Sequence, residues 1–140
     1  MADAVTTQTI VNTDKRAIIK LNNLSDGSGE ASVKKIDVST LSKNPVNGND
    51  CIGVRINKIW YSNIGLNVII NWYASTQVMA IQLPENYSDN LDFASFSGLP
   101  NPTTFGTGGA NGDVYFGTKN EAANDSYTII LECIKIYGNT

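Results

Sequence analysis

The chain has 140 residues, a length typical of one domain, with a net charge of −3 and no histidine. The acidic balance argues against nucleic acid as a partner, because a protein that binds nucleic acid needs a basic stripe. The absence of histidine excludes catalytic triads and metal sites that are built on histidine. Asn, Thr, Ser and Gly together supply 52 residues, a mix that favours turns and strands with neutral outer faces.

The N-terminal part of the chain alternates with period two, the pattern of a half-buried strand. Residues 5–11 are rich in Thr and resemble a strand, so we expect residues 1–15 to form an N-terminal arm or an edge strand. The domain itself is expected over residues 16–140. In residues 16–24 the core-facing set is Ala17, Ile19 and Leu21.

A turn-rich connection follows at residues 25–30, where Asp26-Gly27 is a strong turn former. We expect Ser28 and Glu30 to lie at its polar tip, available to a neighbouring molecule. Residues 33–38 then form a short strand, with Val33, Ile36 and Val38 assigned to the core.

The middle of the chain contains two long strand patterns. In residues 51–62 the apolar phase slips near Asn57-Lys58, which predicts a β-bulge. Residues 63–65 form a tight turn and residues 66–73 alternate again. The two runs together predict a β-hairpin.

The C-terminal half adds further strands. Residues 78–83 form a strand ended by Pro84, residues 87–102 a loop with a short strand, and residues 100–112 a long loop. After a strand around residues 114–116, residues 127–134 are apolar on both faces, so this last strand should be central in its sheet.

These elements predict an all-β fold of eight or nine strands and no helix. Antiparallel strands at this spacing are typical of a β-sandwich, either jelly-roll-like or immunoglobulin-like.

Several apolar side chains fall on the second face of their strands and are candidates for an interface. Trp60 and Tyr61 are adjacent, as are Trp72 and Tyr73, and adjacent strand residues point to opposite faces. Exposed aromatic residues contact protein partners or sugars. The complete set of interface candidates is Ile18, Ser28, Glu30, Trp60, Tyr61, Ile69, Tyr73 and Ile130.

The remaining chemistry is sparse. Cys51 and Cys133 are expected to be buried free thiols, with a bridge as the alternative. Alternating oxygen groups at residues 26, 28 and 30 resemble part of a calcium loop, but turn chemistry explains them without metal. Glu132, facing another carboxylate such as Asp92, Asp113 or Glu85, is the enzymatic alternative, with the carboxylate pair of a glycosidase. We therefore expect no enzyme, metal or cofactor. No leader or membrane-spanning run is readable, so synthesis in a cytoplasm is expected, with no membrane partner.

Four segments carry a resemblance to a known family: residues 24–39, residues 51–56 with 59–61, residues 112–116 and residues 127–132. In this order they resemble small virion structural proteins of tailed bacteriophages, especially those that infect cyanobacteria and other aquatic bacteria. The departures lie mainly in residues 86–111.

The resemblance implies a capsid decoration, or cement, protein on the virion surface. Its partner would be the major capsid protein, it would associate as a homotrimer, and it would stabilise the shell by burying area between subunits. One alternative is an adaptor of the tail, neck or fibre. Another is a host-surface glycan-binding module that uses Trp60, Tyr61, Trp72 or Tyr73.

Overall fold

The computed structural model describes residues 4–27, 29–30, 32–74, 78–96, 98–99, 112–119 and 122–137. These residues form nine strands and two short 3-10 helices, η1 (Val38–Thr40) and η2 (Ala94–Phe96). The strands are β1 (Ala4–Asn12), β2 (Arg16–Asp26), β3 (Val33–Ile36), β4 (Cys51–Ile64), β5 (Asn67–Trp72), β6 (Val78–Leu83), β7 (Tyr87–Asp92), β8 (Val114–Lys119) and β9 (Ala123–Tyr137).

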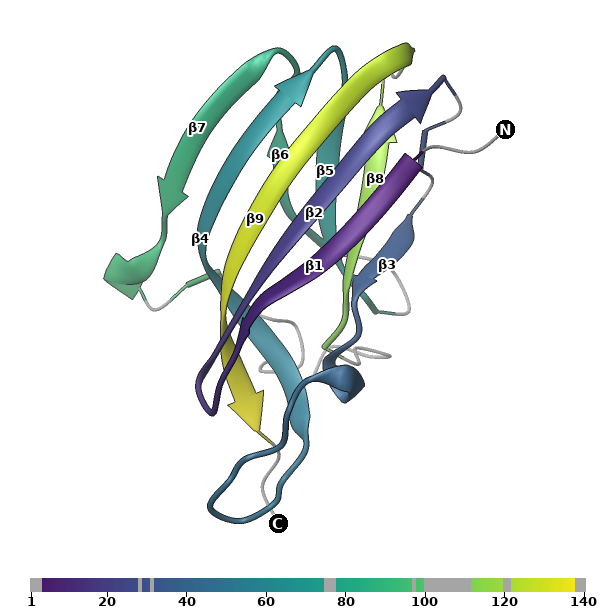
Figure 1. The fold of residues 1–140 in the computed structure, drawn as a ribbon. Helices are drawn as coiled ribbons and strands as arrows, with labels where there is room; N and C mark the ends of the chain where they lie inside the picture. Colours follow the sequence, from purple (N-terminus) through teal and green to yellow (C-terminus); the bar gives the residue numbers. More distant parts are fainter. Residues whose placement is uncertain are drawn as a thin grey trace.

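The strands pack as two antiparallel sheets, so the predicted β-sandwich is confirmed (Figure 1). The five-stranded sheet has the order β1-β2-β9-β4-β7, and the four-stranded sheet has the order β3-β8-β5-β6. From β2 to β9 the chain crosses between the sheets at almost every connection, which is the eight-stranded jelly-roll arrangement rather than the immunoglobulin one. β1 extends the first sheet by one strand.

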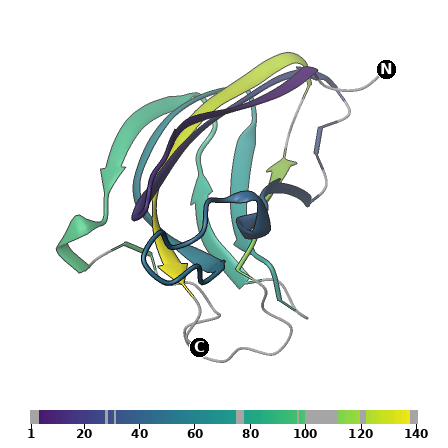
Figure 2. The same cartoon turned by 60° about the horizontal axis from the view of Figure 1, so that its bottom comes forward.

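The core lies between the inner faces of the two sheets, where the alternating apolar residues meet. Figure 2 shows the sheets curving around this space, with η1 across one end. Phe116 and Tyr127 face each other across the layers, with ring centroids 5.9 Å apart in an edge-to-face arrangement. The fully buried large side chains include Leu21, Ile36, Ile56, Ile59, Leu66, Ile70, Leu83, Ile129 and Leu131.

The phase slip in β4 is a real bulge. Ile56 pairs with Cys133 and Lys58 pairs with Glu132, so Asn57 is the extra residue. The bulge keeps both Ile56 and Ile59 at 0% exposure, on the core side of the strand. The central position of the last strand is also confirmed, because β9 lies between β2 and β4.

The predicted hairpin of β4 and β5 is wrong. β4 pairs with β7 and β9, whereas β5 pairs with β6 and β8 in the other sheet. The turn at residues 63–65 therefore carries the chain from one sheet to the other. Sequence alternation shows which residues share a face of a strand. It does not show whether the tight turn after that strand leads into a hairpin in the same sheet or into the other sheet.

The strand after the first turn is shorter than expected. Ile36 and Val38 are buried as predicted, but Val33 is 40% exposed, so its assignment to the core is wrong. Val33 begins β3, which has four residues and lies at the edge of its sheet. An edge strand is covered on one side only, and its first residue stays partly in solvent.

Two further predictions concern the less regular parts of the chain. The short strand expected within residues 87–102 is β7, and the long loop at residues 100–112 lies almost wholly outside the described residues. Within the described part of the chain, no helix is long and apolar enough to span a membrane.

Candidate functional site

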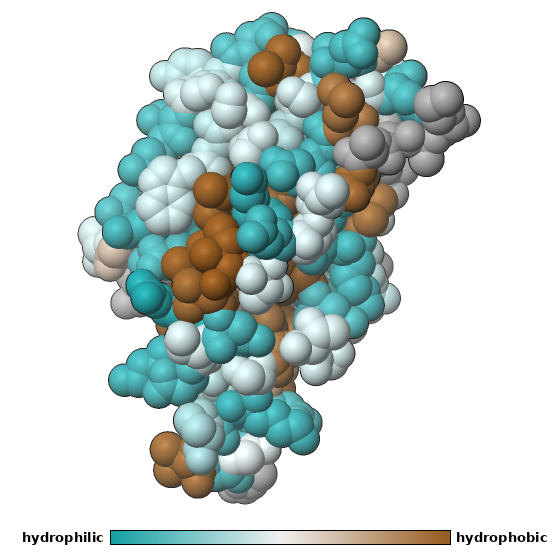
Figure 3. Space-filling view, in the orientation of Figure 1, coloured by the Kyte–Doolittle hydropathy of each residue, from teal (hydrophilic) through white to brown (hydrophobic). Residues whose placement is uncertain are grey.

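The outer face of the five-stranded sheet brings together three of the interface candidates. Trp60 on β4 lies directly opposite Ile130 on β9. Ile18 on β2 lies opposite Glu132, which makes Ile18 a diagonal neighbour of Ile130. All three side chains are half-buried, and Figure 3 shows apolar side chains gathered near the middle of this face.

A row of hydroxyl side chains runs beside these apolar residues. Ser62 on β4 lies opposite Thr128 on β9 and Ser88 on β7, and the Ser88 hydroxyl lies 2.9 Å from that of Ser62. Asn90 on β7 lies opposite Trp60. Side chains directly opposite each other on one face are in contact range, so these groups form one continuous surface.

A shallow surface pocket of about 460 Å³ opens at this place, and we call it the Trp60 pocket. Trp60 and Ile130 supply its apolar part, and the polar part includes the hydroxyls of two serines and a threonine, the amide of an asparagine and one aspartate. The lining residues are Trp60, Tyr61, Ser62, Ser88, Asp89, Asn90, Thr128 and Ile130. Alternation in β4 and β9 places Ser62 with Trp60 and Thr128 with Ile130, but nothing in the sequence shows that β7 lies beside β4. The contribution of Ser88 and Asn90 was therefore missed.

Glu132 does not form a carboxylate pair of the glycosidase kind. Its Oε1 lies 3.1 Å from Nη1 of Arg16, and its Oε2 is buried with no hydrogen-bond partner among the described residues. Lys58 lies between Glu132 and Asp92 in the register of the sheet. Asp113 directly precedes β8 of the other sheet, and Glu85 lies exposed after β6, so neither is brought to Glu132 by the sheet register.

Residues 4–12 form the edge strand β1, paired along β2. Residues 5–10 are exposed, and the segment 4–12 contains no charged residue. The opposite edge strand, β7, carries Asp89 and Asp92. Of the strands at the edges of the other sheet, β3 has four residues and β6 has six, followed by Pro84. β1 is thus the longest edge strand and lacks the charges that usually protect one.

Glu30 is not an exposed tip, and its prediction as a contact for a neighbour is wrong. Its carboxylate pairs with Lys35 in the interior, where both side chains are less than 7% exposed. Oε1 also accepts hydrogen bonds from the Tyr127 hydroxyl at 2.6 Å and from Nδ2 of Asn23 at 2.7 Å. A buried carboxylate with three donors is satisfied within the domain.

Of the other aromatic candidates, Tyr61 is among the residues that line the Trp60 pocket, and Trp72 and Tyr73 are not. Tyr61 is 6% exposed, 6.4 Å from the ring of Tyr87, so its prediction as a surface contact is wrong. Trp72 is 3% exposed in the core. Tyr73 packs against Tyr115, with 5.3 Å between ring centroids and the rings tilted by 31°.

The two remaining interface candidates are not part of this face. Ile69 belongs to β5 of the other sheet and is only 9% exposed. This burial does not support its prediction as an interface residue. Ser28 lies outside the described residues.

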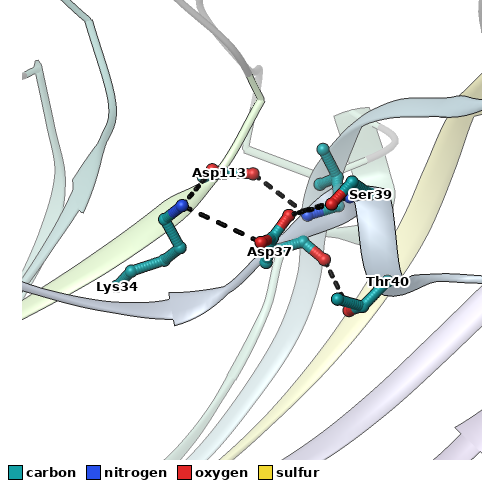
Figure 4. Close-up of polar contacts among 6 residues, drawn as sticks. Lys34, Asp37, Ser39, Thr40 and Asp113 are labelled. Carbon is teal, nitrogen blue, oxygen red and sulfur yellow. Dashed lines mark hydrogen bonds and ion pairs between the residues drawn. The ribbon is translucent and has the colours of Figure 1, made fainter.

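A polar cluster at the start of β8 has a structural explanation (Figure 4). Asp113 accepts a hydrogen bond from the Val38 backbone N–H at 3.0 Å and lies 3.4 Å from Nζ of Lys34. Asp37 accepts from the N–H and hydroxyl of Ser39 and so caps η1. The hydrogen bond to Ser39 is the main reason that the pKa of Asp37 is lowered. These carboxylates hold the turn between β3 and β4.

Both cysteines are free and buried thiols, and burial raises the pKa of each, to about 12 for Cys133. Nearby, the Lys135 ammonium donates to Oδ1 of Asn12, the Thr13 carbonyl and the Ser42 hydroxyl. Burial lowers the pKa of Lys135. Its hydrogen bonds join β9 to the β1–β2 turn and the segment after η1. Within the described part of the chain, no three His, Cys, Asp or Glu side chains are grouped to hold a metal ion.

Comparison with known proteins gives no family. No family model matches the chain, and no curated protein matches it in sequence. Among solved structures the chain is similar to a cupin superfamily protein from Desulfitobacterium hafniense DCB-2. The TM-score is 0.36 and the identity 10%, covering 97% of this chain and 81% of that one.

Proposed function

We propose that the protein is a non-enzymatic structural protein of a tailed-phage virion, acting as a capsid decoration protein that binds the major capsid protein. The proposal starts from the sequence resemblance in residues 24–39, 51–56 with 59–61, 112–116 and 127–132. Jelly rolls also occur in viral capsid domains, so the fold supports the proposal by analogy.

The observation that carries the proposal is the unprotected edge of β1. A nine-residue strand offers its outer N–H and C=O groups to solvent, with no charge or proline to repel another strand. Such an edge is suited to strand addition, in which main-chain hydrogen bonds supply affinity. Val5 and Ile10, 40% and 49% exposed, would add apolar contact. In this proposal β1 pairs with a strand of the capsid protein, and many copies together reinforce the shell.

Self-association as a homotrimer belongs to the same proposal, and sedimentation of the purified protein tests it separately. The adaptor role in the tail, neck or fibre uses the same fold and the same edge. It differs in stoichiometry, because a tail ring needs far fewer copies than a capsid lattice.

The β1 edge is tested by binding to shells purified from phage that lack this gene. Gln8→Glu places one negative charge on the exposed edge, opposite Lys20 on β2, which accommodates it. We expect this variant to bind shells at least about tenfold more weakly, because an edge charge opposes strand addition. Val46→Glu adds the same charge at a site that is 92% exposed, and it should bind like the wild type. Equal binding of all three proteins would refute the role of β1.

A further inference from the structure

We infer that the Trp60 pocket is a binding site for neutral carbohydrate, in addition to the proposed contact of β1 with the shell. The site is formed by β4, β7 and β9 on the outer face of the five-stranded sheet. It supplies the two kinds of contact that a sugar ring requires, an aromatic surface and a set of neutral hydrogen-bonding groups.

The aromatic contact comes from Trp60. An indole is large and apolar but carries an N–H donor, so it suits a ligand with an apolar ring face and polar edges. Trp60 lies between Ile130 and Asn90 in the register of the sheet, and its side chain is half-buried. The strands on both sides hold it in place, so little conformational freedom is lost when a ligand binds.

The polar contacts come from the neighbouring row of the sheet. Thr128, Ser62 and Ser88 lie side by side on three adjacent strands. A hydroxyl both donates and accepts, and the Asn90 amide does the same through two different atoms. These groups therefore match the hydroxyls of a sugar, each of which also donates and accepts.

The charge of the pocket selects a neutral ligand. Its described lining contains one carboxylate, Asp89, and no lysine or arginine. Phosphate, sulfate and acidic sugars need a cation or a cluster of N–H donors, which this lining does not offer. A purely apolar peptide would offer no hydrogen bond to the Thr128 hydroxyl or the Asn90 amide, which costs free energy when they are covered.

The pocket includes residues of β7, which is one edge strand of the five-stranded sheet, whereas β1 is the opposite edge strand (Figure 1). A partner paired with β1 leaves β7 and the pocket open. The carbohydrate site is thus independent of the virion role, and either proposal can fail without the other.

The test is a glycan array that carries neutral hexose and N-acetylhexosamine oligosaccharides together with sialylated and uronic-acid ones. We expect the wild-type protein to bind at least one neutral class. Titration of that oligosaccharide should change the tryptophan fluorescence, and the change should disappear in Trp60→Phe, since the remaining Trp72 is buried.

Variants then locate the site. Trp60→Ala should weaken binding by at least about tenfold and Asn90→Ala by about threefold to tenfold, whereas Trp60→Tyr, which keeps a ring, retains most of it. Ile18→Ala, on the same face but outside the pocket, is the matched control and should bind normally. Binding of no neutral glycan, binding of acidic glycans alone, or binding by Trp60→Ala and Asn90→Ala as tight as that of the wild type would each overturn the inference.

Discussion

Glu30 and Lys35 form an ion pair inside the sandwich, although the sequence places Glu30 in a polar turn. The register of β3 explains the contact. Lys34 pairs with Tyr115 and Ile36 with Val114, so Lys35 is an extra residue in a bulge. A β-bulge changes the direction of one side chain, and here the Lys35 side chain points inward to the Glu30 carboxylate. That carboxylate also accepts a hydrogen bond from the Tyr127 hydroxyl.

Glu30→Gln should strongly destabilise the domain, because it leaves the Lys35 ammonium buried without a counter-charge. Breaking a buried pair from one side costs about 3–5 kcal/mol. Urea unfolding measures the loss. The exposed pair of Lys43 and Asp50, at 3.2 Å, is the control, and Lys43→Met should cost less than about 1 kcal/mol. A loss of under 1 kcal/mol for Glu30→Gln would contradict the buried pair.

The double variant Glu30→Gln with Lys35→Met removes both charges. It should recover part of the stability lost by Glu30→Gln alone, since an apolar side chain of similar size replaces the unpaired charge. Strictly additive losses in the double-mutant cycle would show that the two residues do not interact.

Gly112→Ala should be much more harmful than Gly48→Ala. Both glycines have positive φ, +88° and +75°, where a side chain costs about 1–2 kcal/mol. At Gly112 an added Cβ would also lie 2.0 Å from the Ile52 carbonyl oxygen, whereas at Gly48 it meets nothing within 4 Å. We expect a further loss of about 1–3 kcal/mol or more at Gly112. Similar unfolding midpoints for the two variants would disprove the close approach.

Alkaline pH should destabilise the protein through Cys133. Its pKa is raised from 9.0 to about 12 in the fold, so the unfolded chain loses the thiol proton first. The folded state then holds more protons above pH 9, and the free energy of unfolding falls by about 1.4 kcal/mol per pH unit from this group. The contribution of the Cys133 thiol to the free energy of unfolding is fully present below pH 9 and is lost as the pH rises towards 12.

The variant Cys133→Ala isolates this effect. Urea unfolding between pH 8 and 10.5 should give a shallower decline for the variant than for the wild type, whatever its absolute stability. Parallel pH profiles would show that the buried thiol contributes nothing to the decline.

Thiol accessibility gives a separate prediction. Reaction with a disulfide reagent requires an exposed thiolate, and both Cys51 and Cys133 are buried with raised pKa values. At pH 8 the folded protein should react slowly, while the urea-unfolded protein should release two equivalents at once. Rapid labelling of the folded protein would contradict the burial of these residues.

Alternation predicted the strands, the bulge at Asn57 and the central place of β9, because each follows from local spacing. Pairing was harder to predict. The tight turn before β5 reads as a hairpin, yet it crosses between the sheets, and only tertiary packing decides between these outcomes.

The same limit applied to the candidate site. Ile18, Trp60 and Ile130 could be chosen from the sequence because each is apolar on the second face of its strand. The three residues come together because β2, β9 and β4 are neighbours in one sheet. This pairing joins segments far apart in the sequence, so local spacing does not predict it. Glu30 was misplaced because the bulge that turns Lys35 inward has no local signature in residues 33–36.

The copy number of the protein in purified virions tests the central claim most directly. Quantitative mass spectrometry, referenced to the major capsid protein, should find on the order of hundreds of copies per particle, as repeated binding across a shell requires. A dozen copies or fewer would indicate the tail or neck instead, and absence from the virion would contradict the structural role altogether.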